Sequence, residues 1–315
     1  MKFRKILSLV GQDKLSQENW ASVKSLGEKF VSLPKDSSKL TEEVNDADCL
    51  LMQFLPKVDA GVIDSAPQLK YIGALATGYG NIDVGHAKRK GIVVSNVPGY
   101  ATEAVAELVF AVVLERFREL GGALQQVASG DVSESSFFST REIAGKKFGV
   151  VGAGRIGSRV AEIARAFGAD VCYWSRNRKP DLESKGVKFA ELDKLVSECE
   201  IVSLHAALAK GTESLLNEAR LNKLKSGALL VNLAPNELVD LNALDKRLAE
   251  GDLTYVMDHS DELSPEQLKM LQARKNCVIY PPIGYTTQEA TRNKQEIFVS
   301  NIENFLAGKP ANVVD

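Results

Sequence analysis

The stretch KKFGVVGAGRIGSRVAEIARAFG, residues 146–168, decides the fold. The apolar run FGVV is typical of a buried strand, and RIGSRVAEIARAFG has the spacing of a helix. Between them lies a GxGxxG turn, which is a weak signal alone but here has the strand–turn–helix context of a dinucleotide-binding unit. The alternative is a glycine-rich turn that binds no ligand. The turn residues expected at a pyrophosphate are Gly152, Gly154, Arg155, Ile156 and Gly157.

Each glycine of this turn has a separate purpose in such a unit. Gly152 allows the tight turn, Gly154 lets a pyrophosphate approach the backbone, and Gly157 lets the helix pack closely on the strand. The helix that follows offers free amide donors and a partial positive charge at its first turn. The turn therefore predicts a bound dinucleotide.

The end of the next strand, YWSRNRKP (173–180), predicts which dinucleotide binds. An NAD site usually has an acidic residue here for the ribose 2′-hydroxyl, but this chain has Ser175. Arg176 and Arg178 follow, and guanidinium groups suit the charge and shape of a 2′-phosphate. We therefore expect NADP(H) rather than NAD(H). The alternative is a solvated basic loop beside NAD.

Two series of short apolar runs alternate with helical patterns on either side of residue 102. Such alternation predicts parallel sheets covered by helices on both faces. The expected strands of the first series are 5–10, 29–34, 48–54, 71–77 and 92–98. Those of the second are 146–154, 170–176, 186–190, 201–207, 228–234, 253–259 and 276–282. The expected helices outside the glycine turn are 58–69, 84–91, 102–120 and 286–309.

Composition is that of a globular protein with ordinary charge balance. The 315 residues are 44% hydrophobic and 25% charged, enough for two domains of about 150 residues. A net charge of −2 argues against a nucleic-acid or membrane-surface partner. No apolar run approaches the roughly 20 residues of a membrane helix, and the start MKFRKILSLVG is interpreted as a strand rather than a signal peptide. We expect a cytoplasmic protein.

The four cysteines are Cys49, Cys172, Cys199 and Cys277. They lie far apart in sequence without CxxC spacing, and three of them sit in or beside apolar runs. This pattern favours reduced core thiols and predicts no metal site.

Two stretches carry a family resemblance, ATGYGNIDVGHAKRKGIVVSNVPGYATEAVAEL (76–108) and REIAGKKFGVVGAGRIG (141–157). Along nearly its whole length the chain resembles the D-isomer-specific 2-hydroxyacid dehydrogenases, most closely the glycerate dehydrogenase/hydroxypyruvate reductase branch. The first stretch is similar to that branch's substrate loop and interdomain helix, and the second to its cofactor turn. The resemblance implies an α/β fold of two Rossmann-like, doubly wound parallel-sheet domains with a cleft between them. The expected domains are 1–101 plus 287–315, a discontinuous flavodoxin-like substrate domain, and 102–286, the dinucleotide-binding domain.

The resemblance also assigns binding residues. The backbone of Thr77, Gly78 and Tyr79 matches the loop that holds a substrate carboxylate. Family members pair through the region of helix 102–120, whose nearly all-round apolar surface also needs cover, so we expect a homodimer. The further residues expected to line the dinucleotide are His205, Ala206, Ala207, Thr212, Leu233, Ala234, Pro235 and Asp258.

The chain departs from the family pattern at the residues that transfer the proton. The family uses an Arg for the substrate carboxylate and carbonyl, and a His whose imidazole is oriented by a Glu. These positions fall on Pro235 of VNLAPNELVD, Pro282 of YPPIGYTT and Leu263 of DHSDELSP. The Glu position is the softer assignment, since a shift of one residue would place Glu262 there. The catalytic groups are therefore unknown, with His259 and Glu262 as candidates.

Two hypotheses from different classes remain open. The first is an NADP(H)-dependent oxidoreductase for an unusual carboxylate substrate, with His259, a tyrosine or water as the proton source. Alternation along the strand that ends at Asp258 would instead direct His259 away from the nicotinamide, as a surface residue. The second hypothesis is a dinucleotide-binding sensor or partner-binding module without hydride transfer. The intact cofactor motif favours the enzyme; the loss of all three groups favours the sensor.

Overall fold

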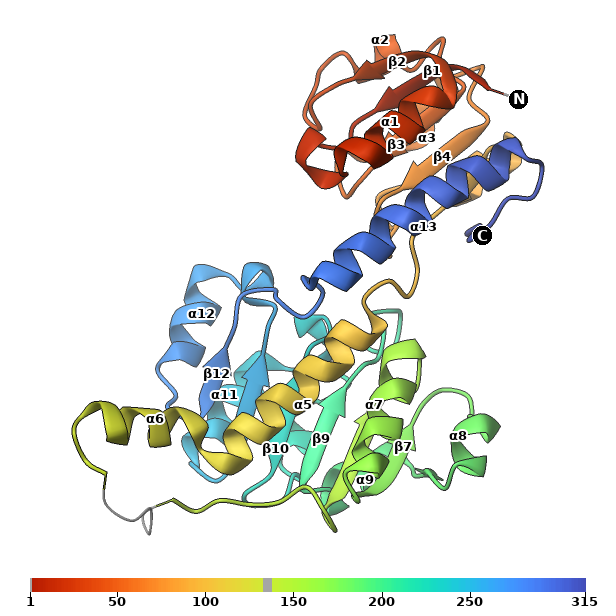
Figure 1. Cartoon of the computed structure of the whole chain (residues 1–315). Helices are drawn as coiled ribbons and strands as arrows, with labels where there is room; N and C mark the ends of the chain where they lie inside the picture. The colour runs from red at the N-terminus through yellow and green to blue at the C-terminus, as the bar shows by residue number, and fades with distance from the viewer. Residues whose placement is uncertain (1, 133–137) are drawn as a thin grey trace. The chain divides into compact units, whose positions relative to one another are not determined.

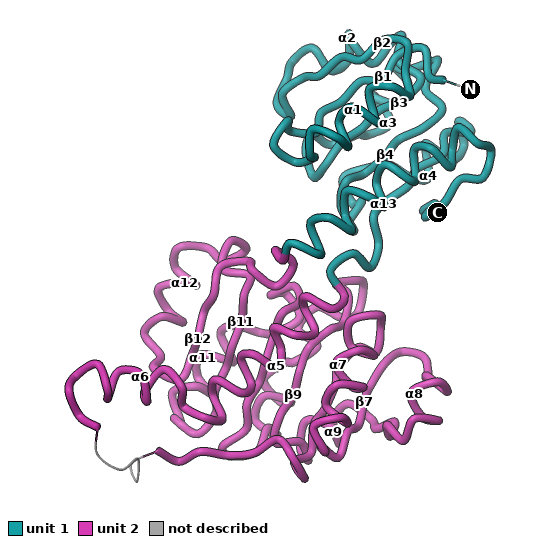
Figure 2. The backbone as a smooth tube through the Cα atoms, viewed as in Figure 1, with its two compact units in different colours: residues 1–101, 288–315 teal, residues 102–287 magenta. Residues whose placement is uncertain are grey.

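A computed structural model describes residues 2–132 and 138–315. The chain forms two compact units, coloured separately in Figure 2. Unit 1 consists of residues 1–101 and 288–315, and unit 2 of residues 102–287. Each unit is built on its own parallel sheet.

Unit 1 has five parallel strands in the order β2-β1-β3-β4-β5 (Figure 1). The strands are β1 Phe3–Ser8, β2 Gly27–Ser32, β3 Cys49–Met52, β4 Tyr71–Ala74 and β5 Val93–Ser95. The helices are η1 Gln12–Lys14, α1 Gln17–Ser25, α2 Leu40–Glu43, α3 Ala60–Asp64, α4 Val84–Arg89 and α13 Gln288–Leu306.

Alternating side chains of β3 build a core on each face of this sheet. Leu50 and Met52 join one hydrophobic cluster, while Cys49 and Leu51 join the other. The second cluster includes Phe298 of α13. Burial on both faces is the reason that β3 is apolar throughout rather than alternating.

Unit 2 has seven parallel strands in the order β12-β11-β10-β9-β6-β7-β8. The strands are β6 Lys147–Val151, β7 Asp170–Trp174, β8 Lys188–Phe189, β9 Ile201–Leu204, β10 Leu229–Asn232, β11 Thr254–Met257 and β12 Cys277–Ile279. The helices are α5 Thr102–Arg118, α6 Leu120–Ala128, α7 Arg155–Ala166, α8 Pro180–Ser184, α9 Leu192–Glu198, α10 Glu218–Leu221, η2 Asn236–Leu238, α11 Leu241–Ala249, η3 Ser260–Glu262 and α12 Pro265–Gln272.

The strand order changes direction beside β6, between β9 and β7. In open parallel sheets, the carboxyl ends of the strands at such a switch point form the usual ligand site. All strands of unit 2 run parallel, so the segments after β6, β7, β9, β10, β11 and β12 emerge at one edge. The predicted cofactor residues of unit 2 follow these strands.

The expected α/β class with two Rossmann-like parallel sheets is confirmed, and each expected strand overlaps an observed one. The expected single helix 102–120 is confirmed as far as Arg118 and wrong only in its last two residues. α5 ends at Arg118, Glu119 has a left-handed backbone with φ 49°, and α6 begins at Leu120. A side chain with positive φ cannot continue a right-handed helix, so the helix breaks there.

The apolar surface of α5, expected to need cover, is largely covered within unit 2. Eight of its residues are already buried within the single chain: Ala104, Val105, Ala106, Val109, Phe110, Val112, Val113 and Phe117. α5 packs beside α7 in unit 2 (Figure 1). The uncovered apolar side chains lie on α6 instead.

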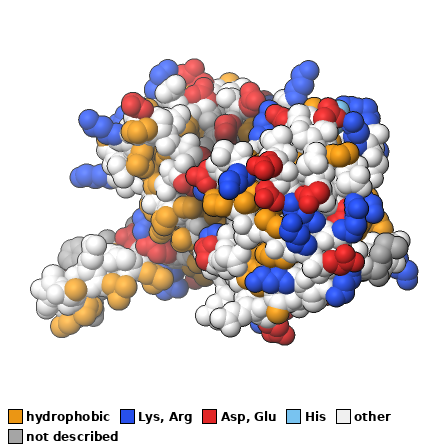
Figure 3. Space-filling model, turned by 90° about the horizontal axis from the view of Figure 1, so that it is seen from above, with side chains coloured by type: hydrophobic (Ala, Val, Ile, Leu, Met, Phe, Trp, Pro, Cys, Tyr) orange, Lys and Arg blue, Asp and Glu red, His pale blue; other side chains and the backbone are white. Residues whose placement is uncertain are grey.

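Charged side chains of both signs are interspersed over the face displayed in Figure 3. This distribution agrees with the small net charge of −2. Within the described part of the chain, no helix is both long and apolar enough to cross a bilayer.

Candidate cofactor and active site

The glycine turn after β6 is shaped by close backbone contacts. Gly152 has φ +99°, and a Cβ there would lie 2.4 Å from the backbone nitrogen of Ala206. A Cβ on Gly157 would lie 2.0 Å from the carbonyl oxygen of Gly152. A Cβ on Gly154 would instead have no atom within 4 Å. Two glycines therefore close the turn, while the third borders open space.

That open space lies at the beginning of α7. Gly154 is the N-cap residue of this helix and offers no side chain to cap its first amides. Arg155 is exposed and Ile156 is half-buried. Uncapped amides and the positive end of a helix dipole form a ready site for an anion. The turn therefore fits the pyrophosphate of a dinucleotide.

The basic segment after β7 is partly engaged in contacts of its own. The Arg178 guanidinium donates to both oxygens of Glu183, at 3.0 and 2.7 Å, and lies 5.0 Å from the Phe189 ring centre. The hydroxyl of Ser175 donates to the carbonyl of Asn177. Arg176 is exposed. The sequence predicts both arginines as phosphate ligands. Because Arg178 already pairs with Glu183, the guanidinium of Arg176 is more available to bind a phosphate.

The segment after β9 begins with His205, Ala206 and Ala207. The imidazole Nε2 of His205 lies 2.8 Å from the Ser203 hydroxyl, and burial lowers its pKa to about 3. The Thr212 hydroxyl contacts the carbonyls of Ala207 and Ala209 at 2.9 and 3.0 Å. Thr212 is thus occupied in holding its own loop.

The segment after β10 is almost wholly buried. Leu233 and Ala234 are each 7% exposed, and the Ala234 amide donates to the side chain of Asn232. Asn232 in turn donates to the Tyr255 hydroxyl at 3.1 Å. Pro235 follows half-buried at the beginning of η2. This segment therefore offers a ligand mainly apolar surface.

Asp258, after β11, carries a buried oxygen that accepts no hydrogen bond from the described residues. The residue is 1% exposed, and its Oδ2 accepts from the Gly284 amide at 2.9 Å. Its Oδ1 has no hydrogen-bond partner among the described residues. Burial raises the pKa of this carboxyl group because it disfavours the charged form. A buried acceptor of this kind suits the amide N–H of a nicotinamide carboxamide, so the chemistry of the site fits the cofactor.

His259 and Glu262 lie together beside Asp258. The Nδ1 atom of His259 is 3.4 Å from a Glu262 oxygen, and its Nε2 is 3.5 Å from Asp258 Oδ1. The structure thus brings both sequence candidates into one cluster. Leu263, by contrast, packs against the hydrophobic core of the unit. Glu262 rather than Leu263 therefore lies next to the imidazole, on the opposite ring nitrogen from Asp258.

Two residues of this cluster escaped the sequence analysis. Asn236 is 4% exposed; its side chain donates to the His259 carbonyl at 2.8 Å, and its amide to Glu262 at 3.3 Å. A Cβ on Gly284 would lie 2.8 Å from Asp258 Oδ2. The motifs VNLAPNELVD and IGYT contain both residues, but neither motif states which partner they hold. Pro282 is half-buried after β12.

The expected substrate loop belongs to unit 1 and follows β4. The Thr77 hydroxyl donates to the Val97 carbonyl at 2.9 Å, and Asn96 donates to the Thr77 carbonyl at 2.7 Å. Gly78 and Tyr79 are exposed. The first residue of the loop is thus anchored while the next two remain accessible.

Comparison with known proteins places this geometry in a family. Residues 110–284 match the family model described as "D-isomer specific 2-hydroxyacid dehydrogenase, NAD binding domain". The chain belongs to the D-isomer specific 2-hydroxyacid dehydrogenases. A member of this family is an NAD(P)-dependent oxidoreductase, and the glycine turn and Asp258 lie in the matched domain.

Three similar proteins cover nearly the whole of this 2-hydroxyacid dehydrogenase. A glyoxylate reductase of Thermococcus litoralis is 36% identical over 88% of this chain and 86% of its own. A hydroxypyruvate reductase of Blautia hydrogenotrophica is 32% identical over 94% of this chain and 95% of its own. An acyclic imino acid reductase, solved with NADPH and D-arginine, superposes with a TM-score of 0.84 at 27% identity, covering 99% of this chain and 100% of that one.

Proposed function

We propose that this protein is an NADP(H)-preferring reductase that acts on a small 2-oxo or 2-imino carboxylate without the proton-transfer residues usual in its family. One observation carries the proposal: unit 2 has open space at Gly154 and a buried acceptor on Asp258, while Pro235 and Pro282 follow neighbouring strands. The relatives named glyoxylate and hydroxypyruvate reductase support a small carboxylate substrate. The exposed loop at Gly78 and Tyr79 is the proposed carboxylate-binding segment.

The cofactor preference rests on Ser175 and Arg176. A hydroxyl in place of a carboxylate removes the repulsion of a 2′-phosphate, and an exposed guanidinium supplies a forked partner for it. Arg178 is the matched control, because its guanidinium already pairs with Glu183. The structure of an NADPH-bound relative supports the same choice.

Calorimetric titration with NADPH and NADH tests this preference. We expect NADPH to bind more tightly, and Arg176→Ala to weaken NADPH by about tenfold, as for the loss of one charged hydrogen bond. Arg178→Ala should weaken it by much less. Ser175→Asp should reverse the preference. Tighter binding of NADH by the unmodified protein would contradict the proposal.

The missing proton donor favours a carbon–nitrogen double bond in the substrate. When bound, the dinucleotide supplies a hydride. Hydride addition to a carbonyl leaves an oxygen that still needs a proton, whereas a protonated imine already carries its proton on nitrogen and becomes an amine directly. Neither Pro235 nor Pro282 can donate a proton or repel a cationic nitrogen. The imino acid reductase with a similar fold supports this substrate class.

A carbonyl substrate would need another acid, and the His259–Glu262 pair is the candidate. The contact at 3.4 Å allows the Glu262 carboxylate to orient the imidazole. We propose that His259→Ala lowers turnover of 2-oxo acids but leaves turnover of imines within about twofold, since imine reduction requires no enzyme-bound donor.

Absorbance of NADPH over a substrate panel tests the function. The panel contains glyoxylate, hydroxypyruvate and pyruvate, each alone and with an excess of ammonia or methylamine. We expect the rate of NADPH consumption to rise by about tenfold or more when amine is added. The reason is that an imine needs no general acid, and a general acid contributes a rate effect of at least this size. Turnover with the oxo acids alone, unchanged by amine, would contradict the imine assignment.

A second candidate function is a dinucleotide-binding sensor or partner-binding module without hydride transfer. The observation behind it is the nonpolar character of Pro235, Leu263 and Pro282 together. NADPH binding without turnover on any member of the panel would favour this candidate. Failure to bind either dinucleotide would remove both.

A further inference from the structure

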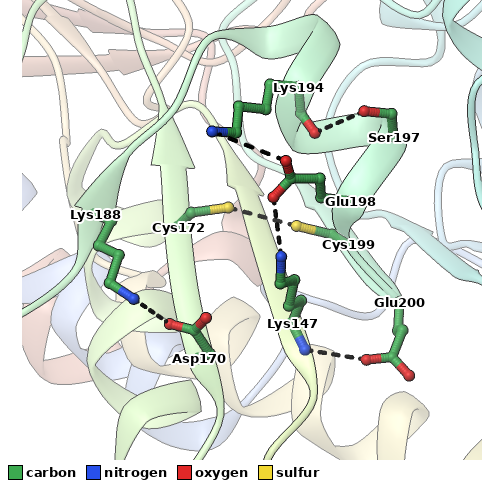
Figure 4. Close-up of polar contacts among 9 residues, drawn as sticks. All are labelled: Lys147, Asp170, Cys172, Lys188, Lys194, Ser197, Glu198, Cys199 and Glu200. Carbon is green, nitrogen blue, oxygen red and sulfur yellow. Dashed lines mark hydrogen bonds and ion pairs between the residues drawn. The ribbon is translucent and has the colours of Figure 1, made fainter.

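Two cysteine side chains that are distant in sequence meet on one face of the unit 2 sheet. The Sγ atoms of Cys172 and Cys199 lie 3.4 Å apart, and the residues are 27 positions apart in the chain. Figure 4 shows the two thiols pointing toward each other. Cys172 lies in β7, and Cys199 follows the last residue of α9.

The room for this contact comes from Gly149 on β6. Gly149 pairs with Cys172 of the neighbouring strand. A Cβ on Gly149 would lie 2.9 Å from Cys199 Sγ and 2.5 Å from the Leu195 side chain. Any larger residue would therefore displace the second thiol. The absence of a side chain on the central strand lets the two sulfurs meet above it.

A small pocket gives access to the pair. Its volume is about 170 Å³, several times the roughly 30 Å³ share of one water molecule. Cys172 is half-buried, whereas Cys199 has no exposed surface. A small solute entering the pocket therefore meets Cys172 first. The charged residues lining the pocket are Lys147, Asp170, Lys188, Lys194 and Glu198.

The two thiols differ in acidity. The hydrogen bond with Cys199 lowers the pKa of Cys172, with a smaller effect of the same sign from Lys147. Burial and the carboxylates of Asp170 and Glu198 oppose this lowering. The same hydrogen bond, together with burial, raises the pKa of Cys199. Deprotonation is therefore easier at the more accessible sulfur, and the thiolate is the nucleophilic form of cysteine.

We propose that Cys172 and Cys199 are a peroxide-reactive thiol pair that closes reversibly to a disulfide, with Cys172 attacking and Cys199 resolving. The Cys172 sulfur attacks one oxygen of hydrogen peroxide; a sulfur–oxygen bond forms, the oxygen–oxygen bond breaks, and one water leaves. The Cys199 sulfur then attacks the sulfenic acid; the disulfide forms and a second water leaves. Two thiols lose two electrons in total, and one peroxide becomes two waters.

The backbone permits this closure. The sulfurs must approach from 3.4 Å to about 2.0 Å, the length of a disulfide bond. Cys199 has an extended backbone, φ −84° and ψ 142°, just beyond α9, so the helix does not hold its side chain. Cys49 and Cys277 serve as internal references, because burial raises the pKa of Cys49 and raises that of Cys277 to about 12.

Mass spectrometry of the full-length protein after brief exposure to hydrogen peroxide tests the proposal. Non-reducing digestion should yield one linked peptide joining Cys172 to Cys199, which dithiothreitol separates. The free-thiol count of the denatured protein should fall from four to two. Cys172 should react about tenfold or more faster than Cys277, as expected from the larger thiolate fraction at lower pKa.

Two variants separate the roles of the sulfurs. In Cys199→Ser, dimedone should trap a sulfenic acid on Cys172, because the resolving thiol is absent. In Cys172→Ser, Cys199 should remain reduced. The proposal would be overturned if the unmodified protein yielded no linked peptide, or if Cys172 reacted no faster than Cys277. The two cysteines would then be side chains that only pack in the core. This measurement uses the unmodified protein and does not depend on the folding of any variant.

Discussion

At the residue scale, two glycines three positions apart have opposite surroundings. A methyl group on Gly157 would overlap the backbone of Gly152, whereas one on Gly154 would enter open space at the N-terminus of α7. The first glycine is needed for the turn to close. The second is needed only when an anion occupies that space. The two requirements can be separated experimentally.

Alanine at each glycine should therefore produce a different defect. Gly157→Ala should lower the free energy of unfolding by about 2–3 kcal/mol, the cost of an overpacked contact with backbone. Gly154→Ala should leave stability unchanged within about 0.5 kcal/mol. It should still weaken NADPH binding by about tenfold. Urea unfolding and calorimetry measure the two effects; unchanged affinity in Gly154→Ala would argue against a pyrophosphate at this turn.

His205 should make unit 2 sensitive to moderate acid. Its pKa is about 3 in the folded protein because burial disfavours the imidazolium, and about 6.5 when unfolded. The unfolded state therefore binds the proton first. The free energy of unfolding is therefore at its full value above about pH 6.5 and decreases as the pH falls toward 3. Between pH 7 and pH 5 the decrease is about 1–2 kcal/mol. In His205→Gln this loss should largely disappear; equal acid sensitivity of both proteins would contradict the assignment.

The sequence allowed the identity of many candidate site residues to be predicted, but not their contacts. The glycine turn carries its own context, so its residues could be named in advance. His259 pairs with Glu262, and Asn236 donates hydrogen bonds to both residues. These contacts depend on how η2 and η3 fold after neighbouring strands. The engagement of Arg178 by Glu183 likewise depends on α8. Such contacts join segments that local spacing does not relate.

At the element scale, α6 is a nine-residue helix none of whose residues is buried. Its sequence LGGALQQVA has no charged side chain. Leu120, Leu124 and Val127 are 50, 73 and 60% exposed, and their spacing places them along one face. Exposed apolar faces of this kind mark association surfaces. We therefore assign the proposed homodimer contact to α6 rather than to α5.

Charge on this face should prevent association. Leu124→Asp combined with Val127→Asp should convert a dimer to a monomer at micromolar concentration, because a carboxylate cannot be buried unpaired. Gln125→Asp is the matched control, since it adds a charge to an exposed neighbouring position. Sedimentation velocity measures both. A monomeric unmodified protein would contradict the dimer itself.

Strands were easier to predict than helices for a physical reason. Parallel strands covered on both faces are apolar runs, and every expected run overlaps an observed strand. Several helices have four or five residues, too few for a 3.6-residue period to be recognised. The break at Glu119 is set by the positive φ of one residue, which glutamate rarely adopts. The capping box of Ser264 and Gln267 was a usable signal for α12.

At the scale of the whole molecule, the chain leaves unit 1 at residue 101 and returns at residue 288. The returning helix α13 contributes Phe298 and Ile302 to the core, each at most 1% exposed. Asn301 donates to the Asn96 carbonyl at 2.8 Å and accepts from Asn312. The core of unit 1 therefore requires both of its segments, 1–101 and 288–315, whereas unit 2 is one continuous segment.

Fragments should reflect this asymmetry. A fragment of residues 102–287 should fold and bind NADPH. A fragment of residues 1–101 should remain largely unfolded, because one face of its sheet has lost Phe298 and Ile302. Circular dichroism and thermal melting distinguish the two, and adding residues 288–315 through a short linker is the control that should restore folding. A cooperative transition in 1–101 alone would contradict this expectation.

The late position of α13 in the chain has a consequence for biosynthesis. After the first 101 residues emerge from a ribosome, the partner helix of their sheet is delayed by the translation of residues 102–287. At about 5–20 residues per second this takes roughly 10–40 s. Throughout that interval, the apolar surface around Tyr71 and Leu51 is open to chaperones and to neighbouring nascent chains. Unit 2 can therefore fold first, and the sheet of unit 1 is covered by α13 only afterwards.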